Sequence, residues 1–300
     1  MKKLFILLAI AILSASAANA EEKTVTYDFG DISSIDANFM YNIQVTKGKS
    51  DKVTLVYDDA IEAFVDLDVK YSNGMLSLGR KKRDKKSESR FGNWTSKSNK
   101  GRVTVYLEMD EISSIRISGA AKISFTGTFR AEDLSIDIHG ASSLNDLQVN
   151  GESLDVDCSG ASKVAVSGNF SKSIDIDISG ASGMTFSGDS NSLKADMSGA
   201  SSFRYNGNAD VCDISCSGAS KATLKGKGGD AEYNCSGASS IDAEDFTAKD
   251  ATVELSGASS LSVYASGDLH YDVNTASKMT YFGDPVLHNN SKSSNVVKGR

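Results

Sequence analysis

A four-residue motif, Ser-Gly-Ala-Ser or a close variant of it, recurs nine times between Ser118 and Ser277. Successive copies are 18 to 21 residues apart. Repetition at a nearly fixed period is typical of solenoids, in which each repeat stacks on the next and the stack buries a continuous core. The second residue of each copy, a glycine in all but the last, occupies positions 119, 140, 160, 180, 199, 218, 237, 257 and 275. Stacking therefore explains most residues of the repeat, and a functional site is expected where the chain departs from it.

Apolar and polar residues alternate on both sides of the motif. Leu154, Val156 and Cys158 alternate with aspartates before one copy, and the alternation resumes at Val164 after it. A period of two predicts β-strands with one buried face. Because consecutive repeats keep the same phase, the strands are expected to stack in parallel and in register, about 4.8 Å apart. The sequence thus predicts an all-β fold, a parallel β-helix with about 20 residues per coil, and it lacks the signature of a leucine-rich repeat.

Each position of the motif has a physical interpretation. The glycine suits a corner that needs a positive φ or a close backbone approach. The alanine that follows it in every copy suggests a corner with room for one methyl group, and the next serine can stack on its equivalents or bond to the corner backbone. The residues four positions after the glycine form an apolar core column: Ile123, Leu144, Val164, Met184, Phe203, Ala222, Ile241, Leu261 and Met279.

Residues 1–20 have the features of a secretion signal peptide. Lys2 and Lys3 provide a charged start, residues 4–13 are all apolar, and Ala18-Asn19-Ala20 is an Ala-x-Ala cleavage site. The apolar run is too short to span a bilayer, for which about twenty residues are needed, although an uncleaved anchor is the alternative to cleavage. We therefore expect an exported chain in the periplasm, at the cell surface or outside the cell, with no transmembrane segment in the mature chain.

The predicted organisation is a signal peptide followed by one β-helix and a short tail. Residues 32–48 resemble the repeat that begins at Ile112, with Phe39-Met40 in place of Gly-Ala, and are predicted to be an atypical starting coil. A short helix is expected from Asp59 to Phe64. The predicted ranges are 1–20 for the signal peptide, 21–285 for a single β-helix domain (21–117 atypical N-terminal coils, 118–283 regular repeats) and 286–300 for a polar C-terminal tail that is a cap or disordered.

The repeated columns, the Ile32-Ser-Ser-Ile35 opening and the Tyr281-Phe-Gly-Asp-Pro285 ending resemble the putative auto-transporter adhesin, head GIN domain family, over about residues 32–285. This family occurs in exported bacterial proteins, especially of Bacteroidetes. The resemblance implies a right-handed, pectin-lyase-like β-helix without the catalytic residues of pectin lyases, and an adhesive role. An autotransporter needs a C-terminal membrane β-barrel, and residues 289–300 have no alternating apolar strands, so self-transport is not expected.

Two outward columns before the motif are rich in carboxylates. Asp155, Asp157, Asp175 and Asp177 would form a two-by-two patch on one face of the β-helix. Like charges about 4.8 Å apart repel by roughly 1 kcal/mol even in water, so the patch favours raised carboxylate pKa values or a bound cation. Ca²⁺, which takes about six to eight oxygen ligands, is the expected ion. The favoured alternative is a solvated charged face that opposes aggregation.

A basic segment spans residues 80–102. It has ten Lys and Arg residues against Asp84 and Glu88, whereas the whole chain has a formal net charge of −7. It also contains Phe91 and the only tryptophan, Trp94. These residues could bind an anionic polymer such as an acidic polysaccharide, lipopolysaccharide phosphate or nucleic acid, with the rings stacking on sugars or bases. The favoured alternative is a flexible loop, and no specific nucleic-acid partner is predicted.

All four cysteines fall on inward positions of the repeat. Cys216 and Cys235 are one coil apart, at a Cα spacing of about 4.8 Å that a disulfide would allow. An exported protein can form disulfides, but parallel side-chain directions make the approach of these two Cβ atoms marginal. Buried free thiols that act as small apolar residues are favoured over a bond.

No catalytic, cofactor-binding or metal-binding residue is predicted. His139, His270 and His288 are not in a Cys/His ligand spacing, and position alone proposes no Ser-His-Asp arrangement. The sequence favours an exported, non-enzymatic β-helix that binds a glycan, a cell-surface component or an envelope component. One alternative is a carbohydrate-active enzyme on acidic polysaccharide, with Asp155 and Asp157 as an inverting pair; another is a periplasmic scaffold with a protein partner. A catalytic site should be a single departure from the repeat, whereas these carboxylates recur.

Overall fold

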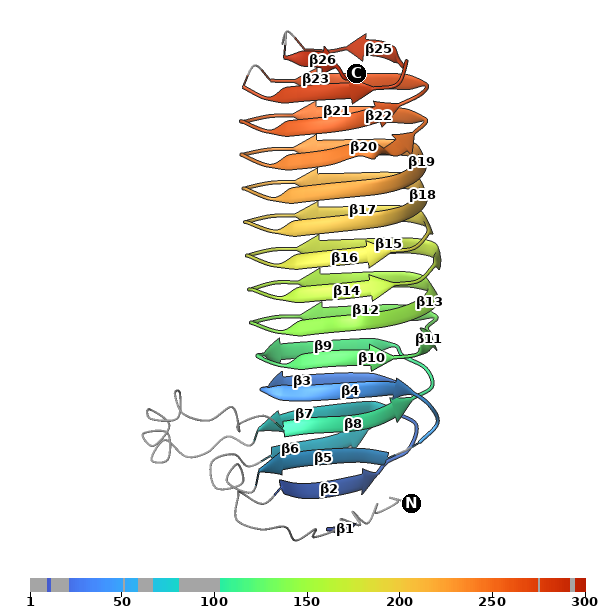
Figure 1. Cartoon of the computed structure of the whole chain (residues 1–300), viewed down its shortest axis with the longest axis vertical. Helices are drawn as coiled ribbons and strands as arrows, with labels where there is room; N and C mark the ends of the chain where they lie inside the picture. The colour runs from blue at the N-terminus through green and yellow to red at the C-terminus, as the bar shows by residue number, and fades with distance from the viewer. Residues whose placement is uncertain are drawn as a thin grey trace, which may run out of the picture.

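The chain forms a long, narrow stack of β-strands (Figure 1). The computed structural model describes residues 10–11, 22–50, 52–58, 67–80, 103–274, 276–291 and 295–300. Within these ranges every regular element is a β-strand. The same ranges contain no helix that is long and apolar enough to cross a membrane.

The regular repeats form strands β9 to β24. Their bounds are β9 (Ser114–Gly119), β10 (Lys122–Thr126), β11 (Thr128–Arg130), β12 (Asp133–Ile138), β13 (Ser143–Cys158), β14 (Lys163–Ser167), β15 (Phe170–Ile178), β16 (Gly183–Ser187), β17 (Ser190–Met197), β18 (Ser202–Cys216), β19 (Lys221–Cys235), β20 (Ser240–Ala248), β21 (Asp250–Leu255), β22 (Ser260–Ala265), β23 (Asp268–Val273) and β24 (Lys278–Phe282). Each pairs in parallel with its equivalent in the next coil. Val156 is opposite Ile176, and Ile176 is opposite Ala195. These offsets of 20 and 19 residues confirm a parallel, in-register β-helix with the predicted period.

Each regular coil has two walls, a corner edge and a bend edge. The Gly-Ala-Ser motif makes the corner edge, at the left in Figure 1, and the chain turns back at the bend edge on the right. Apolar side chains of both walls are buried between them, such as Ile176 on β15 and Val166 on β14. Near the bend edge, buried rings pack along the stack, with the ring of Phe186 6.1 Å from Phe170 and 5.9 Å from Tyr205. The core thus runs continuously from coil to coil and holds the corners in line.

The corner geometry explains the glycine of the motif. Gly160 has a φ of +80°, and a Cβ added to it would lie 2.5 Å from the carbonyl oxygen of Gly140 in the neighbouring coil. Both predicted reasons for glycine, the positive φ and the close approach, are therefore confirmed. The alanine differs from its predicted role, because Ala161 is exposed. Its position is fixed by its amide, which donates to the oxygen of Gly140 at 2.7 Å.

The serine after the alanine is a buried column. Ser162, Ser220 and Ser239 are at most 2% exposed. Each of their hydroxyls donates to the carbonyl oxygen three residues earlier, at 2.8 Å. The hydroxyls of Ser259 and Ser277 contact each other across coils at 3.2 Å. The two predicted roles, bonding to the corner backbone and stacking, are both confirmed.

At the N-terminal end, the order of the chain differs from the order of the stack. The strands are β1 (Ile10–Ala11), β2 (Glu22–Asp28), β3 (Ser34–Phe39), β4 (Tyr41–Lys47), β5 (Lys52–Asp58), β6 (Leu67–Ser72), β7 (Met75–Arg80) and β8 (Val103–Met109). The coil of β3 and β4 lies between two others, because Ile35 is opposite Ile115 of β9 on one side and Leu76 of β7 on the other. The prediction that residues 32–48 are the starting coil is therefore wrong. Strands β7 and β8, later in the chain, cover its outer edge.

Antiparallel strands close this end of the stack. Strand β5 pairs antiparallel with both β8 and β2, and β6 pairs antiparallel with β7. Phe39-Met40, which replaces Gly-Ala, lies where the parallel coils meet these antiparallel strands. The next residue, Tyr41, is buried, and its hydroxyl donates to the carbonyl oxygen of Gly79 in the adjacent coil at 2.7 Å. The short helix predicted from Asp59 to Phe64 lies outside the described residues, as do nearly all of residues 1–20.

The stack continues beyond Pro285, where the tail was predicted to begin. Strand β25 (Val286–Asn289) pairs in parallel with β23, and β26 (Val296–Lys298) pairs in parallel with β24. Residues predicted to form a polar tail thus add two strands to the β-helix. Of the two predicted possibilities, cap or disorder, these strands act as the cap.

Candidate functional site

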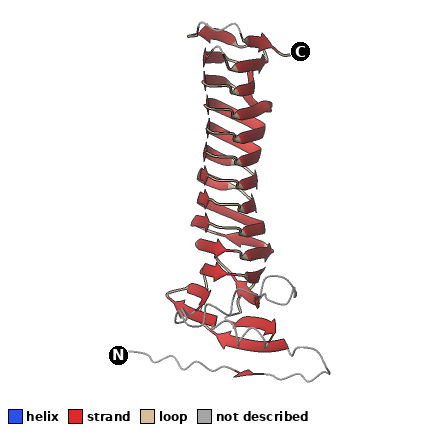
Figure 2. Ribbon diagram, turned by 90° about the vertical axis from the view of Figure 1, so that its left-hand side faces the viewer, coloured by secondary structure: helices blue, strands red, loops and turns tan. Residues whose placement is uncertain are grey.

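The corner edge of the β-helix faces the viewer in Figure 2. A groove runs along this edge. Its volume is about 740 Å³, and it extends over six coils, from Asp177 to Asn274. On a coil spacing of about 4.8 Å, five steps between coils give a length of about 24 Å. The shape suits an extended ligand that lies along the rod.

Three columns of the repeat line the groove. One is polar and mostly acidic: Asp177, Asp196, Ser215, Asn234, Glu254 and Asp272. The second is buried and apolar, and forms the floor: Ile178, Met197, Cys216, Cys235 and Leu255. The third is the first residue of each motif: Ser179, Ser198, Ser217, Ser236, Ser256 and Asn274. The groove therefore offers carboxylates, amides and hydroxyls at regular intervals.

The strand and the corner together explain why these columns leave a hollow. Successive side chains of a strand point to opposite faces, so Asp196 and Ser198 lie on the outer side while Met197 is buried between them. The following residue, Gly199, has a φ of +74° and turns the chain toward the other wall. The same three steps recur in each coil, and their repetition makes the hollow continuous.

The groove is negatively charged. Its lining contains the carboxylates of Asp177, Asp196, Glu254 and Asp272 and no basic side chain. Beside it, the ammonium group of Lys194 lies 3.3 Å from the carboxylate of Asp196. Burial, and next the carboxylates of Asp196 and Asp157, raise the pKa of Asp177 above its ordinary value. The groove therefore favours neutral or cationic ligands over anionic ones.

Replacing Asp177 by Asn is expected to raise the melting temperature at pH 7. Because its pKa is raised in the folded state, the folded protein binds this proton more tightly than the unfolded chain does. The stability it contributes therefore falls as the pH rises through the raised pKa. The gain in the Asp177→Asn variant should be largest at pH 7 and shrink as the pH is lowered toward the ordinary carboxyl pKa of about 4. Thermal melts across this range test it, and an equal gain at every pH would contradict it.

The predicted two-by-two acidic patch forms. Asp155 is opposite Asp175, and Asp157 is opposite Asp177, as expected. The next residue along the first of these columns is Lys194, opposite Asp175, so a basic residue borders the patch. Among the described residues, no three His, Cys, Asp or Glu side chains are arranged to hold a metal ion. Binding of Ca²⁺ at the patch stays a prediction.

The two strands that flank the basic segment in the sequence meet the corner edge. Strand β7 ends at Arg80 and β8 begins at Val103, and these strands pair with β3 and β4 on either side of their corner. Residues 81–102 therefore connect two strands where other coils have the motif. They lie outside the described residues, and their predicted binding of an anionic polymer is not tested. The guanidinium of Arg80 lies over the ring of Phe39, 5.5 Å from its centre.

The four cysteines are buried and free, which confirms the prediction of free thiols over a disulfide bond. Cys216 and Cys235 are opposite each other in adjacent coils. The thiol of Cys216 contacts the sulfur of Met197 at 3.7 Å, across the groove floor. The thiols therefore act as small apolar residues of the core.

The structure brings together a Ser, a His and an Asp that position in the sequence did not connect. Nε2 of His139 lies 2.5 Å from Oδ1 of Asp137, and Nδ1 of the same ring lies 2.5 Å from Oγ of Ser159. The sequence contained one sign of this group, because His139 stands where most copies of the motif have their first serine. The stacking offset of about one period then places Ser159 beside it.

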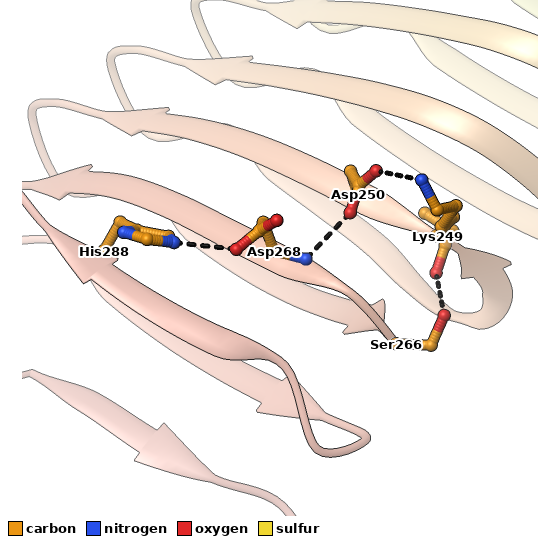
Figure 3. Close-up of polar contacts among 6 residues, drawn as sticks. Lys249, Asp250, Ser266, Asp268 and His288 are labelled. Carbon is orange, nitrogen blue, oxygen red and sulfur yellow. Dashed lines mark hydrogen bonds and ion pairs between the residues drawn. The ribbon is translucent and has the colours of Figure 1, made fainter.

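A second polar cluster fastens the last coils together (Figure 3). Nε2 of His288 on β25 lies 2.7 Å from Oδ1 of Asp268, whose amide donates to Oδ1 of Asp250 at 2.8 Å. The ring of His288 also stacks on that of His270, with 4.2 Å between centres. The amide of Asp268, and next the ammonium of Lys249, lower the pKa of Asp250. These contacts link three successive coils and hold β25 on the stack.

The sequence matches the family model described as putative auto-transporter adhesin, head GIN domain, over residues 31–185 and 172–285. No curated protein matches the chain at a significant level.

Several solved structures have a similar backbone course. A putative adhesin from Parabacteroides distasonis ATCC 8503 is 14% identical, with a TM-score of 0.46, and the match covers 93% of this chain and 97% of that one. A putative lipid binding protein from the same strain is 15% identical, with a TM-score of 0.45 and coverage of 93% and 97%. A putative adhesin from Parabacteroides merdae ATCC 43184 is 17% identical, with a TM-score of 0.42 and coverage of 94% and 98%.

Proposed function

Since the chain belongs to the putative auto-transporter adhesin, head GIN domain family, we propose that it is an exported adhesin that binds an extended, neutral or cationic glycan along its corner-edge groove. The family description fits an exported or surface protein. The features of a signal peptide in residues 1–20 support the same location. The proposed role requires binding without cleavage of the glycan chain.

The observation that carries the proposal is the groove itself. It presents a polar side chain in two columns of every coil over six coils, so a polymer with repeating units can make equivalent contacts along its length. Carboxylates and amides accept hydrogen bonds from sugar hydroxyls, and carboxylates also attract ammonium groups. A chain of amino sugars or of neutral sugars meets these requirements.

The negative charge of the groove argues against the alternative of an enzyme that cleaves acidic polysaccharide. An acidic polysaccharide would approach the carboxylates of Asp177, Asp196, Glu254 and Asp272 with no basic side chain in the lining to offset them. The suggested inverting pair, Asp155 and Asp157, lies on exposed positions of β13 that do not line the groove. Surface proteolysis of intact cells separates the proposed adhesin from the alternative of a periplasmic scaffold with a protein partner, because only a surface protein is cleaved.

The proposal is tested by calorimetric titration with short chains of chitosan, chitin and oligogalacturonate, which are cationic, neutral and anionic. We expect chitosan to bind most tightly and oligogalacturonate not to bind. The double variant Glu254→Gln, Asp272→Asn keeps the shape of the groove and removes two charges. It should weaken chitosan binding about tenfold, because charged hydrogen bonds contribute about 1.5 kcal/mol or more.

A matched control removes two carboxylates elsewhere. Asp242 and Glu244 are exposed on β20 and do not line the groove. The variant Asp242→Asn, Glu244→Gln has the same net charge as the groove variant and should bind chitosan as the parent protein does. Equal weakening in both variants, or tightest binding of oligogalacturonate, would overturn the proposal.

A further inference from the structure

Two corners depart from serine at the first position of the motif, His139 inside the stack and Asn274 in the last copy. The first position of the motif is serine in every copy from Ser118 to Ser256 except at His139. A site with its own chemistry is expected at a departure inside the stack, because the repeated residues are already explained by stacking. His139 is also flanked by the two partners that such chemistry needs.

The partners lie on either side of the imidazole. Asp137 is two residues earlier at the end of β12, and its Oδ1 is 2.5 Å from Nε2 of His139. Ser159 occupies the equivalent corner of the next coil, and its Oγ is 2.5 Å from Nδ1. Oδ1 of Asp137 is shielded from water, and this contact is an ion-pair approach without a hydrogen bond. Catalytic contacts often align only when substrate binds.

This order of contacts defines the protonation state that the chemistry needs. A carboxylate accepts hydrogen bonds only, so in the aligned state that the chemistry needs, Nε2 of His139 carries the proton and donates it to Asp137. The lone pair of Nδ1 then faces the hydroxyl of Ser159 and can accept its proton. Asp137 orients the ring and stabilises the imidazolium that forms, which is the role of the acid in Ser-His-Asp triads.

The nucleophile and its surroundings are open to a substrate. The His139 side chain is 46% exposed, and Ser159 is half-buried at the corner edge. The amide of Gly160, the residue after Ser159, is on an exposed residue and makes no hydrogen bond among the described residues. It is available to donate to a developing oxyanion. Ser179, the corner serine of the following coil, already lines the groove.

We propose that Ser159, His139 and Asp137 form a serine esterase site that cleaves carboxylic esters, such as acyl groups carried on a glycan. Oγ of Ser159 attacks the carbonyl carbon while His139 takes its proton, and the alcohol leaves with that proton as the carbon–oxygen bond breaks. Water, activated by the same imidazole, then releases the carboxylic acid and restores Ser159. Only the glycan as carrier rests on the proposed function; the ester chemistry does not.

The test uses two probes that do not depend on the groove. The first is hydrolysis of p-nitrophenyl acetate, and the second is covalent labelling by a fluorophosphonate, located by peptide mass spectrometry. We expect the label on Ser159 and on no other corner serine. Ser159→Ala should abolish labelling and, because general acid–base and nucleophilic groups contribute about 100-fold or more, lower hydrolysis by about that factor.

The variant His139→Ser separates chemistry from folding. It restores the residue that most other corners have at this position, so the fold should be kept while hydrolysis falls to background; Asp137→Asn should lower the rate less. Ser118→Ala, at the corner on the other side of His139 and outside the groove lining, should leave the rate unchanged. Labelling spread over many serines, or hydrolysis unaffected by Ser159→Ala and His139→Ser, would overturn the inference. Chitosan binding should be intact in all of these variants, so failure here is distinct from failure of the adhesin proposal.

Discussion

Replacing Gly188 by alanine is expected to destabilise the middle of the β-helix by about 3 kcal/mol or more, since both backbone strain and a steric clash oppose the new side chain. Gly188 has a φ of +144°, and a Cβ added to it would lie 1.9 Å from the carbonyl oxygen of Gly168 in the neighbouring coil. The obstacle is backbone held in a parallel ladder, so it cannot move aside without separating coils. Circular dichroism melts of both proteins measure the effect.

A matched control lies in the same coil. Gly183 has no positive φ, and an added Cβ would meet the side-chain oxygen of Ser202 at 2.9 Å. This hydroxyl can rotate, and lysine or serine occupies the position in neighbouring coils, as at Lys163. Gly183→Ala should therefore change stability by less than about 0.5 kcal/mol. Similar losses of stability in the two variants would show that the backbone around Gly188 does not constrain this position as described.

Replacing Phe186 by alanine is expected to cost about 3 to 5 kcal/mol, the usual range for removing a fully buried ring. Its ring is buried between those of Phe170 and Tyr205, at 6.1 and 5.9 Å between centres. The cavity would lie between coils, and because each coil of a solenoid contacts only its neighbours, the two halves of the rod should also unfold less cooperatively. Denaturant titration followed by near-ultraviolet circular dichroism measures both effects.

The control for this prediction is an aromatic residue outside the core. Tyr106 on β8 is 45% exposed, so Tyr106→Ala removes a ring without creating a cavity. We expect a change below about 1 kcal/mol for it. If Phe186→Ala were tolerated equally well, the continuous aromatic packing near the bend edge would not contribute to stability as the structure implies.

The regular part of the fold was predictable because each coil repeats the same local physics. Glycine at 160, the alternation around Val156 and the buried serine at 162 each follow from one residue type in one column. The N-terminal order was not predictable in this way. Strand β3 has a pattern that fits either β7 or β9 as neighbour, and it pairs with both. The packing of the antiparallel strands decides which coil ends the stack. This packing has no periodic pattern in the sequence.

The candidate site was predictable only in part. The acidic column could be aligned from the sequence, and its members from Asp177 onward line the groove. The groove itself depends on how the chain turns at the corner after each buried residue. The alternation of apolar and polar residues does not predict this turn. The contacts of His139 depend on the direction of corner side chains and on the offset between coils. Aligning the columns places Ser159 near His139, but the two distances that define the group come from the structure.

Zero-length cross-linking shows directly whether the ligand binds in the corner-edge groove. A carbodiimide joins carboxylates to amines in contact with them, so a short chitosan chain bound to the protein would be fixed where its amines lie. Mass spectrometry of the digested product locates the linked residues. We predict links at the groove residues Asp196, Glu254 and Asp272, and none above background at Asp242 and Glu244 on the wall. Links that favour the wall residues, or that are spread equally over both sets, would contradict the account.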